Sequence, residues 1–230
     1  MSPKEEVLAT SPGFPEKPAE TSVPILSALA RRWSPVRFDS RRDIGKDDLR
    51  GVLEAARWAP SSFGEEPWRF LVARRQDPHR EAMEGALSEG NWWARDASVL
   101  LVSVAKETFT RNGKPNRFFA HDTGLATSAL LAEATHRGLI SHPMGGFHTG
   151  KIREAFQVPE GFTILAMIAL GWHDPEVRTR PFGSGRGQPA GAAHWRIPSS
   201  EGPLGTPWRT EAGGLRGAGP RRILAVSGPE

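Results

Sequence analysis

The chain has no cysteine among its 230 residues, and this excludes disulfide bridges, thiolate catalysis and cysteine-based zinc or iron–sulfur sites. No uninterrupted apolar run approaches the roughly 20 residues needed to cross a bilayer. The segment Met1–Glu6 carries acids and no apolar stretch, so no secretory signal is expected. We therefore expect no membrane partner and a cytoplasmic location, which the lack of cysteine permits.

Clusters of catalytic or metal-binding side chains are also missing from the sequence. The seven histidines are spread singly, and His142 and His148 lack a third ligand at metal spacing. No Ser-His-Asp order and no nucleophile elbow is present. We expect no metal and no catalytic side chain of these kinds.

The positive charge is dispersed along the chain. The formal net charge is +4 and the pI is about 9.9, but many arginines lie beside acids or near the C-terminus. No Lys/Arg stripe with interleaved aromatics is found, so a nucleic-acid partner is not expected and a basic nucleic-acid-associated protein is a distant alternative. The excess charge favours anionic small ligands.

The composition divides the chain into three parts. Residues 1–22, rich in Pro, Glu, Ser and Thr, predict a disordered leader. The apolar residues concentrate in the domain predicted at 23–177. Gly and Pro make up roughly a third of residues 181–230, against an average of about one residue in eight. We interpret 178–230 as a disordered tail or as the product of a frameshift; within it only 222–226 could form a strand.

Hydrophobic periodicity predicts an α+β domain. Leu49, Val52, Leu53 and Ala56 follow the helical spacing in 46–58. Further helices are predicted at 23–32, 78–89, 116–139 and 150–156, strands at 68–73, 98–105 and 162–172, and a loop at 142–147. Because these elements do not alternate as regular βαβ units, a sheet flanked by helices fits better than a doubly wound fold.

Two segments carry the strongest chemical signals. Arg32 and Ser34 lie two residues apart and would share a face of extended backbone, where a guanidinium and a hydroxyl can hold a phosphate; the alternative is an ordinary basic helix end. The turn at 59–70 places adjacent hydroxyls and free N–H groups where they could hold a flat polar ligand; the alternative is a purely structural turn. Together the segments suggest a nucleotide-like cofactor.

These segments, in this order, resemble the nitroreductase family of FMN-dependent oxidoreductases. The resemblance spans about residues 23–175 and includes Met144-Gly145-Gly146-Phe147, between the longest helix and the final strand. It implies a mixed, mainly antiparallel sheet flanked by helices, in a homodimer with the flavin at the interface and the C-terminus reaching across to the partner. It also implies FMN as cofactor, NAD(P)H as hydride donor and ping-pong reduction of nitro, quinone or similar small-molecule acceptors.

The resemblance also assigns site residues. The backbone of Gly145 and Gly146 would orient flavin N5, and Phe118 and Phe119 would lie near the substrate unless they simply pack in the core. The residues expected to bind the cofactor are Arg31, Arg32, Trp33, Ser34, Arg37, Pro60, Ser61, Ser62, Gly64, Asn91, Met144, Gly145, Gly146, Arg178 and Arg180.

Three positions depart from the family pattern. Val36 replaces a basic residue, Gly64 replaces an asparagine and Glu66 replaces a glutamine. A carboxylate beside reduced, anionic flavin would be repulsive. Two alternatives to the reductase therefore stay open: a flavin-binding module with little or no turnover, and a specialised branch that consumes flavin or removes halogens.

Overall fold

The computed structural model describes residues 17–174 and 225–226. Most of the predicted leader, nearly all of the predicted tail, and Arg178 and Arg180 lie outside these residues. The helices are α1 (Ser27–Arg31), α2 (Lys46–Arg57), α3 (Arg80–Gly85), α4 (Phe119–His136) and α5 (Thr149–Ala155), with the 3-10 helices η1 (Ser62–Gly64) and η2 (Glu89–Asp96). The strands are β1 (Trp68–Arg74), β2 (Val99–Lys106), β3 (Ile140–Met144), β4 (Phe162–Gly171) and β5 (Ala225–Val226).

The strands form one mixed sheet in the order β3-β4-β2-β1-β5. The first three pairings in this order are antiparallel, with Leu71 opposite Val102 in β1 and β2. Strand β5 pairs parallel with β1, where Phe70 faces Ala225. The predicted mainly antiparallel α+β fold is confirmed, and residues 225–226 of the strand predicted at 222–226 are in a strand.

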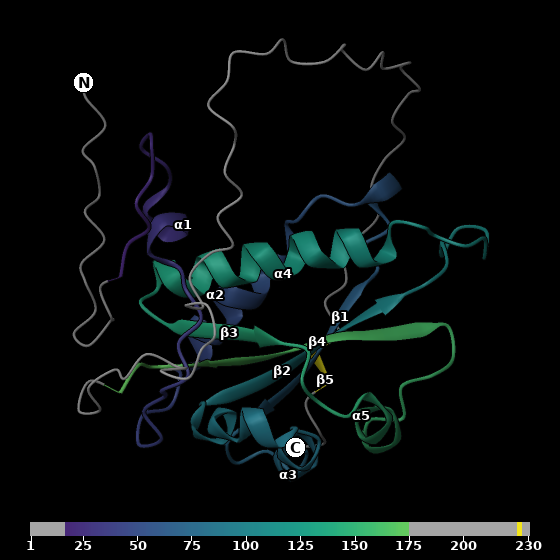
Figure 1. Cartoon of the computed structure of the whole chain (residues 1–230). Coiled ribbons are helices and arrows are strands. Elements are labelled where there is room, and N and C mark those ends of the chain that lie inside the picture. Colours follow the sequence, from purple (N-terminus) through teal and green to yellow (C-terminus); the bar gives the residue numbers. More distant parts are fainter. Residues whose placement is uncertain (1–16, 175–224, 227–230) are drawn as a thin grey trace.

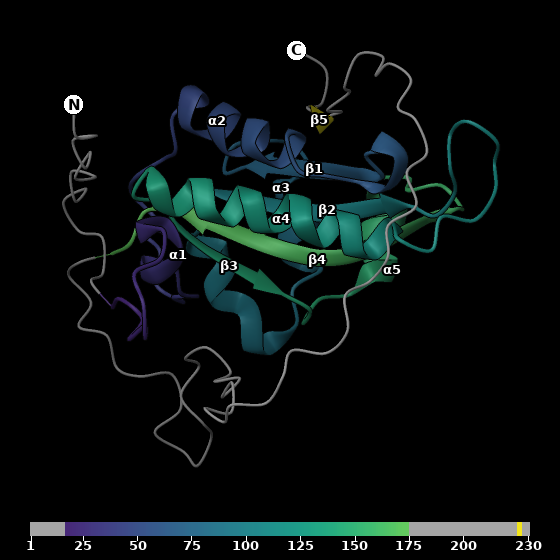
Figure 2. The same cartoon turned by 90° about the horizontal axis from the view of Figure 1, so that it is seen from above.

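Helices cover both faces of this sheet (Figures 1 and 2). Helices α2 and α4 pack on one face, where Phe70, Leu101 and Leu130 belong to one buried cluster. Helices α3 and α5 pack on the other face, where Met83 and Met167 belong to a second cluster. Alternate residues of β1 and β2 enter opposite clusters, as the period of two in a strand requires. The core is thus two apolar layers separated by the sheet.

Three segments differ from the sequence prediction. The helix predicted at 23–32 is confined to Ser27–Arg31. The helix predicted at 78–89 is shorter, since α3 ends at Gly85 and Leu87 instead makes a β-bridge with Phe147. The loop predicted at 142–147 begins as β3, which includes Pro143. A proline is tolerated there because β3 is an edge strand. Among the described helices, none is long and apolar enough to cross a membrane.

Candidate functional site

The predicted phosphate-binding residues Arg32 and Ser34 lie together. The Arg32 guanidinium donates to the Ser34 hydroxyl over 3.4 Å in a half-buried setting. Burial lowers the pKa of Arg32, but an arginine keeps its charge at every physiological pH. Within residues 17–174, no Asp or Glu side chain is ion-paired with Arg32. The pair therefore presents a positive charge and a hydroxyl that fit an anion. Arg31, Trp33 and Arg37 flank it and are half-buried.

An aromatic stack lies beside this pair and joins it to η2. The Trp93 ring stacks on Phe38 with centroids 6.1 Å apart and contacts the His142 ring at 4.6 Å. The His142 Nδ1 lies 3.1 Å from the Pro35 carbonyl oxygen. Burial lowers the pKa of His142, and the nearby Arg32 charge adds to the effect. No sequence motif connects His142 to Arg32, because it is their packing in the fold that brings them together.

We expect the lowered pKa of His142 to make the protein less stable in mild acid. The unfolded chain takes up a proton near the ordinary histidine pKa of about 6.5, whereas the folded chain does so only at lower pH. The free energy of unfolding should therefore fall as the pH drops through that window. Urea unfolding at several pH values measures this, with His142→Asn expected to flatten the profile. Equal profiles for wild type and His142→Asn would contradict the expectation.

The predicted glycine loop lies at the end of β3 and contacts η2. Asn91 Nδ2 donates to the Gly146 carbonyl over 2.8 Å, and the Ser88 hydroxyl donates to the same oxygen. A Cβ added at Gly146 would lie 2.4 Å from Asn91 Nδ2, whereas one at Gly145 would meet nothing within 4 Å. The structure thus brings Asn91 next to Gly146, where a side chain would push the Asn91 amide and the Ser88 hydroxyl away from this carbonyl. The neighbouring Met144 is buried.

The predicted serine turn is a strained 3-10 turn fixed to the start of α4. The Ser62 N–H donates to Asp122 Oδ2 over 2.8 Å, and Ser61 Oγ accepts the Glu66 N–H at 3.0 Å. Phe63, Gly64 and Glu66 all have positive φ, of 56°, 65° and 50°. Glycine suits such a conformation, which gives the departure at position 64 a local structural reason. Pro60, at the start of the turn, is exposed.

Asp122 holds the predicted serine turn in place and is not among the predicted site residues. Its side chain is only 4% exposed, and Oδ1 lies 2.9 Å from Nδ1 of the exposed His121. Phe118, at the start of α4, makes an edge contact with the His121 ring at 6.5 Å and is exposed, while Phe119 is half-buried. The two phenylalanines therefore lie at the same end of α4 as the serine turn. A lone Asp in an Ala-rich helix gave no signal from which this could be found.

The predicted site residues fall into two groups that lie apart in a single chain. In both views α1 lies beside the C-terminal end of α4, while η1 lies beside its N-terminal end (Figures 1 and 2). At 1.5 Å per residue, α4 is about 27 Å long. The first group contains Arg32, Ser34 and the Gly145–Gly146 loop, and the second contains the serine turn and the phenylalanines. The structure does not join them within one chain.

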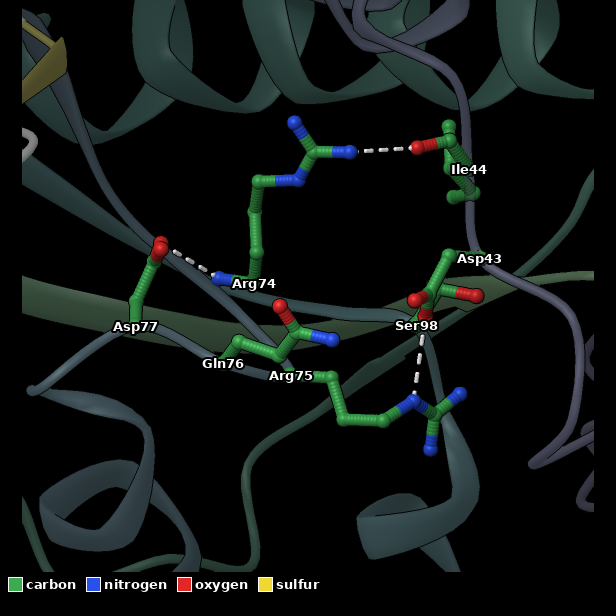
Figure 3. A pocket seen from close by; sticks show the side chains of 7 residues that line it. All are labelled: Asp43, Ile44, Arg74, Arg75, Gln76, Asp77 and Ser98. Atoms are coloured by element: carbon green, nitrogen blue, oxygen red, sulfur yellow. Dashed lines mark hydrogen bonds and ion pairs between the residues drawn. The ribbon is translucent and has the colours of Figure 1, made fainter.

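A separate polar hollow opens at the end of β1 (Figure 3). Arg75 is ion-paired with Asp43 at 3.0 Å, and Arg74 donates to the Ile44 carbonyl over 2.6 Å. Its lining contains none of the predicted site residues: Asp43, Ile44, Arg74, Arg75, Gln76, Asp77 and Ser98. These interactions hold the loop before α2 against β1.

In residues 17–174, no group of three His, Asp or Glu side chains could hold a metal ion.

A mixed sheet between two helical layers, with an arginine–serine pair and a glycine loop beside η2, is the arrangement of a nitroreductase-fold protein. The model of the Nitroreductase family matches residues 29–112 and 90–172, well over half of the chain. The chain therefore belongs to the nitroreductase family, as its sequence motifs predicted.

Individual relatives agree with this assignment. A putative NADH dehydrogenase/NAD(P)H nitroreductase of Archaeoglobus fulgidus is 28% identical over 61% of this chain and 81% of its own length. A crystal structure described as an oxidoreductase containing FMN is 32% identical, with a TM-score of 0.64, over 68% of this chain and 80% of that one. A putative nitroreductase from Desulfovibrio desulfuricans in complex with FMN is 25% identical, with a TM-score of 0.58, over 70% and 92% of the two chains.

Proposed function

We propose that the chain is an FMN-dependent NAD(P)H oxidoreductase of the nitroreductase type, with its catalytic domain at 23–177. The observation that carries the proposal is the half-buried Arg32–Ser34 pair, connected through His142, Trp93 and η2 to the glycine loop. FMN-containing structures of related chains support the choice of cofactor. Bound FMN would supply the redox chemistry, accepting hydride from NAD(P)H at N5 and passing it to nitro, quinone or similar acceptors in a ping-pong cycle.

The residues present fit FMN. Arg32 and Ser34 would hold the phosphate, because a guanidinium and a hydroxyl offer donors in fixed directions. Gly146 has no side chain between its backbone and a planar ring, and its N–H makes no hydrogen bond to the described residues. This N–H would orient flavin N5 and favour the negative charge that develops on reduction.

The separation of the two groups of residues supports a homodimer in which each flavin is shared. One copy would contribute Arg32, Ser34 and the glycine loop, and the other would contribute Ser61 and Ser62. The exposed side of α4 between them carries small residues such as Ala120, Gly124 and Ser128, which allow close approach of a second copy. We further propose a cytoplasmic enzyme that acts on small molecules and not on nucleic acid.

Purification and anaerobic reduction test this proposal. We expect the protein to be yellow, or to become yellow when loaded with FMN, and its flavin absorbance to bleach when NADH or NADPH is added. Regain of colour on adding a quinone or nitroarene would complete the cycle. A protein that cannot be loaded with FMN would contradict the proposal. A yellow protein that neither nucleotide bleaches would instead favour a flavin-binding module without turnover.

A further inference from the structure

Three hydrogen bonds converge on the carbonyl oxygen of Gly146. Ser88 contributes its backbone N–H at 3.2 Å and also its hydroxyl, and Asn91 contributes Nδ2 at 2.8 Å. The bridge between Leu87 and Phe147 holds the same two segments together. The segment that follows α3 therefore clamps the loop that follows β3, although the two lie more than 50 residues apart in the sequence.

The contacts of Ser88 and Asn91 fix one peptide plane of the loop, whereas the backbone N–H of Gly146 stays without a partner among the described residues. The Phe147 N–H bonds the Gly145 carbonyl at 3.0 Å, so both polar groups of the Gly146–Phe147 peptide are engaged. Because no peptide bond is cis among the described residues, the Gly146 N–H points away from the engaged Gly145 oxygen. This N–H has no partner among those residues.

We propose that Ser88 and Asn91 are positioning residues that hold the Gly146 N–H in the direction in which it meets flavin N5; the inference rests on the function proposed above. Two successive glycines have the greatest backbone freedom of any dipeptide, so the loop needs external restraint to keep one orientation. A donor held in advance costs no reorganisation when negative charge develops on reduction. The Asn91 amide acts here through Gly146, which differs from the direct flavin contact that the family resemblance suggested.

The FMN-loaded protein tests the proposal through its midpoint potential. We expect Ser88→Ala and Asn91→Ala each to lower the potential, and the double variant to lower it by about 30 mV, the change that a tenfold loss of preference for reduced FMN gives in a two-electron couple. Affinity for oxidised FMN should change less than affinity for reduced FMN. Ser88→Thr, which keeps a hydroxyl, should retain most of the wild-type potential. Asn112→Ala, in an exposed turn, is the matched control.

Hydrogen exchange in the FMN-free double variant gives a second readout. We expect the Phe147 amide to exchange faster while the amides of β4 keep their protection, which separates a loosened loop from general unfolding. An unchanged potential in a yellow, reducible double variant would overturn this inference alone. A shift with Asn91→Ala and none with Ser88→Ala would also overturn it, because it would indicate direct contact of Asn91 with the flavin. Failure of the wild type to bind FMN would overturn the proposed function instead.

Discussion

Replacing Arg32 by alanine should raise the dissociation constant of FMN about 100-fold, since each tenfold step corresponds to about 1.4 kcal/mol and charged hydrogen bonds contribute about 1.5–3 kcal/mol each. Arg32 is half-buried beside the Ser34 hydroxyl, and no described carboxylate is ion-paired with it. Arg32→Lys should raise the dissociation constant of FMN about tenfold, because an ammonium keeps the positive charge but lacks the planar pair of donors of a guanidinium. Titration of the FMN-free protein with FMN, followed by flavin fluorescence, measures both.

Riboflavin provides the control, because it lacks the phosphate. If Arg32 holds the phosphate, Arg32→Ala should lower the affinity for FMN and leave the affinity for riboflavin unchanged. Arg50→Ala, on the exposed side of α2, should change neither affinity. Equal losses for both ligands would contradict the assigned role.

The same variant tests whether each site is shared between two copies. Mixed dimers of Arg32→Ala with the double variant Ser61→Ala/Ser62→Ala should regain tight FMN binding at one of their two sites. If the mixed dimers do not regain tight FMN binding, Arg32 and the two serines would have to bind FMN within one chain.

Replacing Arg80 by alanine should lower the free energy of unfolding by about 3–5 kcal/mol, because it removes a buried guanidinium from two backbone carbonyls and from the partly exposed Glu84, and each buried acceptor left unpaired costs about 1–3 kcal/mol. The guanidinium is almost fully buried under the sheet, and burial lowers its pKa. It donates to the carbonyls of Arg95 at 2.9 Å and Ala97 at 2.7 Å and pairs with Glu84 at 2.6 Å. Its loss would leave buried acceptors unpaired, so α3 would separate from the segment that leads into β2.

Urea unfolding measures the effect. Arg80→Lys should retain the ion pair and lose one of the carbonyl bonds, and so lie between wild type and Arg80→Ala. Glu81→Ala, exposed on the same helix, is the control. A loss below about 1 kcal/mol, the usual range for exposed ion pairs, would contradict the structural role of Arg80.

Local signals in the sequence predicted most of the fold. The apolar spacing of Leu49, Val52 and Leu53 places α2 correctly, and Gly138, with φ of 74°, ends the helical segment that contains α4. Strand β3 was missed because Pro143 and the nearby glycines are typical of a loop. Only the partner strand β4 stabilises this short segment as an edge strand, and pairing over such a distance leaves no local pattern.

The candidate site was predicted less completely, for the same reason. Motifs indicated Arg32, Ser34 and Gly146, because each belongs to a short run of characteristic residues. The buried Asp122 and the polar contacts of Ser88 depend on residues more than 50 positions away. Such contacts arise only when the sheet brings the segments together.

The stack of Phe38, Trp93 and His142 makes the fluorescence of Trp93 a probe of ligand binding. There is no tyrosine in the sequence, so near-ultraviolet emission arises from its eight tryptophans. Trp93 contacts His142, whose pKa responds to the charge of Arg32, so one indole lies close to the proposed phosphate site. A ligand that absorbs in the blue should quench that indole by energy transfer. Trp93→Phe should reduce this quenching, whereas Trp33, which flanks the Arg32–Ser34 pair, should still be quenched.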